Sequence, residues 1–101
     1  MDESKRMKDL PRVELALIRE QRANEFHRAM ADWRAGHQTE EQRRICSDLG
    51  EAYRSALDDE IDNLQEIDDD ENATEILLVL QYARAMRMIL EEDLELIKNI
   101  H

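Results

Sequence analysis

The fold is decided by residues 73–99, whose sequence reads ATEILLVLQYARAMRMILEEDLELIKN. This stretch contains no Gly or Pro and is rich in Ala, Leu, Met, Glu and Arg, which are the residues that favour helices. Asn72 followed by Glu75 has the spacing of an N-terminal capping box. The apolar residues recur at helical spacing, so the stretch predicts one long helix that begins at about residue 73.

Two more helices are expected before this one. Pro11 suits the first helical position and Gly36 suits a helix end, which predicts a helix over about 11–35. Thr39 followed by Gln42 is a second capping box, and it predicts the start of another helix. The sequence therefore contains three long helical segments.

The composition supports a single helical domain. Two Gly and one Pro in 101 residues are too few for the many turns of a β-sheet protein. The middle helix is expected to end near residue 67, and short connections make neighbouring helices antiparallel. We therefore predict an all-α, antiparallel up-down-up three-helix bundle over residues 11–101, preceded by a flexible segment at 1–10.

The apolar face of the third helix is wider than a bundle of this size requires. It covers roughly half of the helix circumference, against about 100° for an ordinary surface helix. One interpretation is a tight core with several exposed Leu and Ile side chains. The other, which we favour because large apolar patches are uncommon on monomers, is a homo-oligomer interface, most simply that of a dimer. The residues expected at this interface are Leu78, Tyr82, Ala85, Ile89, Leu96 and Ile100.

Acidic side chains are in large excess and give the chain a formal net charge of -11. A chain with this charge is repelled by phosphate backbones and anionic lipid, so neither a nucleic acid nor a membrane is an expected partner. Over residues 58–71, nine of fourteen side chains are acidic. This region is either a solvated tip or a docking surface for a basic protein. The candidate docking residues are Asp58, Asp59, Asp62, Asp68, Asp69 and Asp70.

Three charged residues interrupt the apolar sides of the first two helices. Arg19 and Arg22 lie among apolar residues of the first helix, and Glu60 lies among those of the second. Antiparallel packing of the two helices places Glu60 near Leu15 and one turn from Arg19. We therefore predict a structural Arg19–Glu60 ion pair. The alternative is a pocket in which both arginines bind an anionic ligand.

Metal-binding motifs are incomplete. No Glu-x-x-His pair precedes any of the three histidines, which argues against a diiron or dimanganese site. Asp68, Asp70 and Asn72 match the first ligands of a calcium loop, but Ala73 replaces the required Gly and Val79 replaces the final Glu. No metal or cofactor is therefore expected.

The sequence carries weak signals for two enzyme classes. A magnesium-dependent nucleotide pyrophosphatase needs acidic clusters on adjacent helices, but the clusters at 58–62 and 91–95 would lie roughly 18 Å apart by helical rise. Arg22 and His27 have a spacing found in some helical ribonucleases, although one such pair is expected by chance. Cys46 is the single cysteine, so no internal disulfide forms and a cytoplasmic location is expected.

These observations favour a non-enzymatic protein-protein interaction module, such as an adaptor, an assembly factor or a subunit of a larger complex. We expect it to self-associate through the third helix and to present acidic surface. The alternative is an acidic inhibitor or antitoxin-like protein that mimics nucleic-acid charge and blocks a basic cleft. Salt separates the two, because a charge mimic loses affinity steeply as the ionic strength rises.

Overall fold

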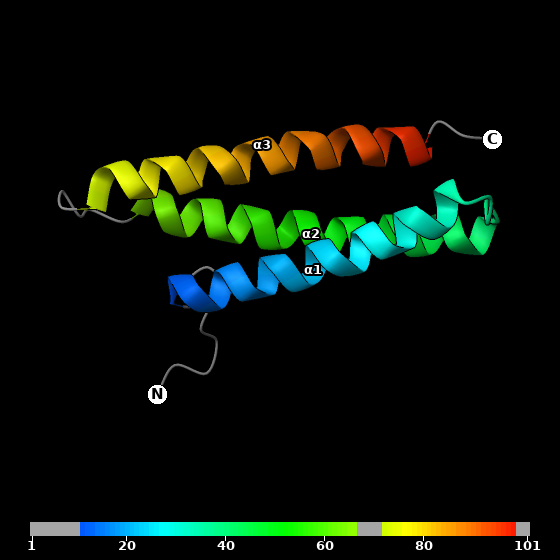
Figure 1. Ribbon diagram of the computed structural model, residues 1–101, viewed down its shortest axis with the longest axis horizontal. Helices are drawn as coiled ribbons and strands as arrows, with labels where there is room; N and C mark the ends of the chain where they lie inside the picture. Colours follow the sequence, from blue (N-terminus) through cyan, green and yellow to red (C-terminus); the bar gives the residue numbers. More distant parts are fainter. Residues whose placement is uncertain (1–10, 67–71, 99–101) are drawn as a thin grey trace.

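The computed structural model describes residues 11–66 and 72–98, which form three long helices (Figure 1). Helix α1 spans Arg12–Arg34, α2 spans Glu40–Glu66 and α3 spans Ala73–Lys98. Successive helices run in opposite directions (Figure 1). The all-α, up-down-up three-helix bundle is therefore confirmed. The segment expected to be flexible, 1–10, lies outside the described residues.

The first two helices begin at residues that the sequence singles out. Pro11 has an extended ψ of 146° and precedes α1, and its carbonyl accepts a bond from the Leu15 N–H at 3.1 Å. It therefore caps the helix instead of occupying the expected first helical position, because its extended ψ keeps it outside the helical backbone. Thr39 caps α2 as expected: its Oγ1 accepts a 3.0 Å bond from the backbone N–H of Gln42.

Helix α1 ends in a glycine turn. Gly36 has a φ of 113°, a left-handed conformation that glycine adopts without steric cost. The Gly36 N–H donates to the Trp33 carbonyl and the His37 N–H donates to the Asp32 carbonyl, both at 3.2 Å. This pair of bonds is the Schellman motif, and it turns the chain back toward α2.

Helix α2 is the central element of the fold. Both α1 and α3 pack along it, whereas α1 and α3 approach each other at few points (Figure 1). Each outer helix therefore has one side on α2 and another side without a close neighbour in the described part of the chain.

The core consists of two clusters. The larger one lies where all three helices meet, and its bulkiest members are Phe26, Met30, Trp33, Tyr53, Leu57, Leu90, Leu94 and Ile97. The smaller one joins α2 to α3 through Leu64, Ile76 and Leu80. The three helices thus share one end of the core, and α3 continues along α2 at the other.

Gly50 lies at the closest approach of the helices. A Cβ atom at this position would lie 2.5 Å from Leu94 Cδ2 and 3.0 Å from Phe26 Cε1. A glycine within a helix is unfavourable by about 1 kcal/mol relative to Ala. At this position the cost is offset, because the missing side chain lets Leu94 and Phe26 pack directly over the α2 backbone.

Candidate interaction surface

The outer side of α3 carries a stripe of exposed apolar residues. Leu78 is 61% exposed, Tyr82 53%, Ile89 56% and Leu96 49%. Ala85 lies between them and is also exposed. These are the positions at which the sequence predicted an interface, and neither α1 nor α2 covers them. The sixth candidate, Ile100, lies outside the described residues.

Two apolar seams with heptad spacing run along α3. The inner seam faces α2 and consists of Ile76, Leu80, Ala83, Arg87, Leu90, Leu94 and Ile97, of which all but Arg87 are buried. The outer seam consists of Leu78, Tyr82, Ala85, Ile89, Glu92 and Leu96, all of which are exposed. In both seams successive members are alternately four and three residues apart, which is the spacing by which helices pack side by side in coiled coils.

Sequence reasoning missed one member of the outer seam. Glu92 is an exposed acid in the middle of an apolar row, and its position appears only when the 4-3 spacing is followed through Ile89 to Leu96. A projection of the helix at 100° per residue instead places Glu92 beyond the edge of the apolar arc. The heptad period is the signal that could have found it.

Arg19 connects all three helices beside the outer seam. Its Nε donates to Glu60 Oε1 at 2.7 Å, so the structure brings together the two residues that the helix register predicted. The Glu60 side chain is 1% exposed and that of Arg19 16%. The Arg19 guanidinium also lies 5.5 Å from the centroid of the Tyr82 ring, in a cation-π arrangement. A positive charge is thus held next to the N-terminal half of the outer seam.

Two buried polar atoms near this ion pair make no hydrogen bond within the described part of the chain. They are Glu60 Oε2 and the Tyr53 hydroxyl. Burial raises the pKa of Tyr53, and the nearby positive charge of Arg19 opposes that shift. The hydrogen bond from Arg19 therefore offsets the cost of removing only one oxygen of the buried Glu60 carboxylate from water.

The second arginine considered for an anionic-ligand pocket lies elsewhere. Arg22 Nη1 donates to Glu25 Oε1 at 3.2 Å on the surface of α1, whereas Arg19 bonds to Glu60. Each guanidinium is thus paired with a different carboxylate. This arrangement gives no support to a pocket that both arginines share.

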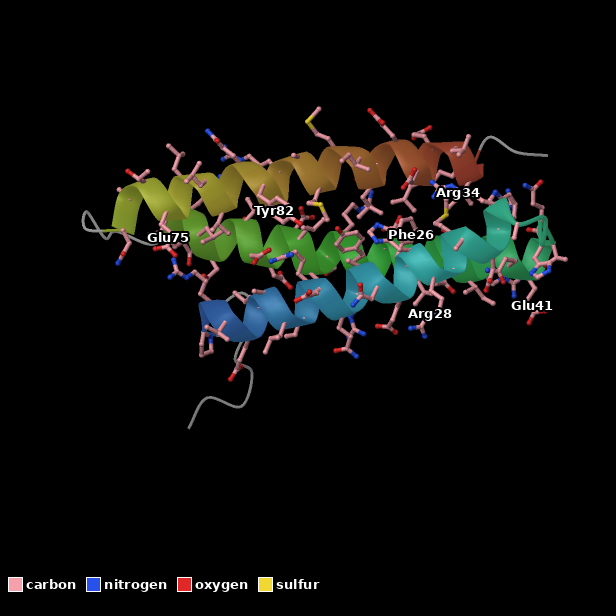
Figure 2. The ribbon with its side chains drawn as sticks, in the orientation of Figure 1. Phe26, Arg28, Arg34, Glu41, Glu75 and Tyr82 are labelled. Carbon is pink, nitrogen blue, oxygen red and sulfur yellow. The ribbon has the colours of Figure 1, made fainter. Side chains whose placement is uncertain are left out.

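A small pocket opens beside the outer seam. Its volume is about 180 Å³, and mostly apolar side chains of all three helices line it, including Phe26, Tyr53 and Leu90. Ile89 of the outer seam forms part of its wall. The exposed apolar surface therefore continues from α3 toward α1. Arg34 of α1, which Figure 2 labels, pairs with Asp93 of α3 at 3.4 Å.

The candidate acidic docking residues do not form one open surface in the described part of the chain. Asp58 accepts a hydrogen bond from Arg87, and Asp59 is half-buried. Asp62 is exposed. The other three candidates, Asp68, Asp69 and Asp70, lie outside the described residues.

Ion pairs also tie α2 to α3 on the side opposite the outer seam. Arg54 donates to Glu91 Oε1 at 3.0 Å and to Glu51 one turn earlier on its own helix. The hydrogen bond from Arg54 lowers the pKa of Glu91, and the same bond raises that of Arg54. The acids proposed for magnesium chemistry include Asp58 and Glu91, and each of these is paired with an arginine.

The two remaining chemical candidates lie in different surroundings: His27 is exposed on α1, whereas Cys46 is buried. The His27 ring lies 5.8 Å from that of Phe26 and 6.0 Å from that of Tyr53, whereas Arg22 bonds to Glu25. The Cys46 thiol is fully buried, and burial raises its pKa, which disfavours the reactive thiolate. Among the described residues, no three His, Cys, Asp or Glu side chains are grouped closely enough to hold a metal ion.

Comparisons with family models, curated proteins and solved structures find no match to this chain. None of the helices over 11–66 and 72–98 combines the length and apolar character needed to cross a membrane. The outer seam of α3 is the candidate functional surface of the described residues, because it exposes large apolar side chains at heptad spacing.

Proposed function

We propose that this protein is a non-enzymatic interaction module that pairs with a second copy of itself through the outer seam of α3. The observation that carries the proposal is the exposure of four large apolar side chains at heptad spacing on a helix whose inner seam is already buried. A helix with two such seams is suited to packing against two neighbours. In the described part of the chain, α2 occupies one of them.

Burial of the outer seam supplies the driving force for pairing. A large apolar side chain gains about 1.5–3 kcal/mol when it passes from full exposure to full burial. The four large side chains are between 49% and 61% exposed, so their complete burial stabilises the dimer by roughly 3–7 kcal/mol for each copy. An association cost of at least about 4 kcal/mol must be subtracted from the combined gain of the two copies, and the remainder is the free energy of dimerisation. We therefore expect a reversible dimer with a Kd between about 1 µM and 1 mM.

Sedimentation velocity across this concentration range tests the proposal. Leu78→Asp places a charge in the outer seam and is expected to leave the protein monomeric. Leu77→Asp is the matched control, because Leu77 is the neighbouring residue, is 52% exposed and lies on another side of α3. It is expected to dimerise like the unmodified chain. A chain that stays monomeric throughout, or two variants that lose the dimer equally, would refute the proposal.

The same seam suits an adaptor, an assembly factor or a subunit of a larger complex, and the net charge of -11 favours a basic protein as a further partner. The charge-mimic alternative draws less support, because Asp58 is paired with Arg87 instead of facing a partner. Measuring self-association and binding to an added basic protein, each at low and at high salt, separates the two. Apolar pairing changes little with salt, whereas binding through acidic groups weakens steeply.

A further inference from the structure

Glu92 is the one charged residue of the outer seam between its end members Leu78 and Leu96, and it restricts how two copies can pair. It is exposed, and it lies between Ile89 and Leu96 in the row that a partner helix would contact. The orientation of the partner decides which group each Glu92 meets. This inference rests on the self-association proposed above.

Parallel pairing brings identical residues together. In that orientation Glu92 of one copy faces Glu92 of the other in the centre of the contact, and the two carboxylates repel each other. Like charges placed opposite one another at an interface oppose association. The seam therefore disfavours a parallel dimer.

Antiparallel pairing places Glu92 next to a positive charge. The register that uses all six members of the seam joins residues whose numbers add to 174, so Leu78 meets Leu96 and Ala85 meets Ile89. The third pair is Glu92 of one copy with Tyr82 of the other. Because the Arg19 guanidinium lies 5.5 Å from the Tyr82 ring centroid, the carboxylate arrives beside a cation.

We propose that two copies pair through antiparallel α3 helices, with Glu92 of each copy against Tyr82 and Arg19 of the other. The two Leu78–Leu96 contacts close the ends of the interface, and the small Ala85 accommodates Ile89 near its centre. Charge complementarity and the apolar pattern thus select the same arrangement.

Cysteine cross-linking tests the orientation in the full-length chain. Leu78→Cys and Leu96→Cys are prepared separately, mixed and allowed to form disulfides, and the unmodified chain with its buried Cys46 serves as the control. Antiparallel pairing is expected to give the mixed 78–96 disulfide, because only residues with Cα atoms within about 7 Å can be joined. Two copies of residue 78 would lie roughly 27 Å apart along the helices and should not cross-link.

The outcomes separate failure of the orientation from failure of self-association. A dimer that cross-links 78 to 78, or one that gives no 78–96 product, overturns the antiparallel arrangement and leaves the dimer standing. A chain that sediments as a monomer at every concentration overturns the proposed function and the orientation together.

Neutralising Glu92 provides a second and independent test. In the antiparallel dimer, Glu92→Gln removes two attractions to Arg19, one from each copy, and is expected to weaken the dimer about two- to thirtyfold, as two exposed ion pairs do. In a parallel dimer the same change removes a repulsion, so tighter association would overturn the proposal. Glu95→Gln is the matched control, because Glu95 is exposed and lies outside the seam, and its Kd is expected not to change.

Discussion

Removing Arg19 is expected to destabilise the bundle far more than removing its partner Glu60. Arg19→Met leaves the carboxylate of a residue that is 1% exposed without a hydrogen bond from the guanidinium. Loss of one partner of a buried ion pair costs about 3–5 kcal/mol. The Arg19 side chain is 16% exposed, so water reaches part of the site and we expect a loss near the lower limit, about 3 kcal/mol.

The opposite substitution is expected to be mild. Glu60→Met removes a carboxylate whose Oε2 already lacks a hydrogen bond within the described part of the chain, and methionine fills a similar volume. Arg19 can then extend its guanidinium to water while its aliphatic part stays packed. We expect Glu60→Met and the double variant Arg19→Met/Glu60→Met to lie within about 1 kcal/mol of the unmodified protein.

Urea unfolding at pH 7, followed by circular dichroism, measures all four proteins. The measurements are made at a low protein concentration, so that dissociation of a dimer does not contribute to the free energy of unfolding. The expected double-mutant cycle gives an interaction energy of about 3 kcal/mol. If Glu60→Met costs as much as Arg19→Met, or if the two losses simply add, the account of a poorly compensated buried carboxylate is wrong.

Three further predictions follow from single contacts. Gly50→Ala should destabilise the fold by about 1 kcal/mol in urea unfolding, although alanine has the better helix propensity. The reason is that the alanine Cβ would lie 2.5 Å from Leu94 Cδ2, and a stabilised variant would contradict this. Arg54 lowers the pKa of Glu91, so the stability from this pair is present above the carboxylate's unfolded pKa and is lost as the pH falls through the folded value. Glu91→Gln should therefore flatten the acid limb of a stability-pH profile, and an unchanged limb would count against the pair. Cys46 is fully buried, so its thiol should react with a thiol reagent only as fast as the protein unfolds, and immediate labelling of the folded protein would contradict its burial. Burial also raises the pKa of the Cys46 thiol, so the contribution of this residue to stability should fall as the pH rises above about 8.5, the pKa of a cysteine in an unfolded chain.

Much of the fold could be read from short-range signals. Thr39 and Gly36 mark helix ends because a side-chain acceptor and a positive φ are local requirements, and the structure uses both residues in this way. The structure places the first helical residue one position after Pro11, where the sequence predicted Pro11 itself. A proline can serve either as a cap or as the first helical residue, and the local sequence does not separate the two. The reason for a glycine at position 50, inside α2, lies in longer-range packing, because Leu94 packs directly over the α2 backbone there.

The candidate site depended on longer-range geometry. The Arg19–Glu60 pair could be placed from the turn that joins their helices, since antiparallel packing sets the register. The approach of Arg19 to Tyr82 could not, because it depends on how α1 and α3 tilt across α2. The sequence also could not predict that Glu60 Oε2 lacks a hydrogen bond among the described residues, because pattern reasoning identifies a partner for a charge but does not count its hydrogen bonds.

The central position of α2 has a consequence for how the chain folds. Close helix packing in the described residues occurs between neighbours in the sequence, α1 with α2 and α2 with α3. Such a topology has low contact order, because no long loop must close before a favourable contact forms, and helical proteins of this type fold within microseconds to milliseconds. We therefore expect the isolated chain to reach its native state quickly, well before it meets a second copy at low concentration.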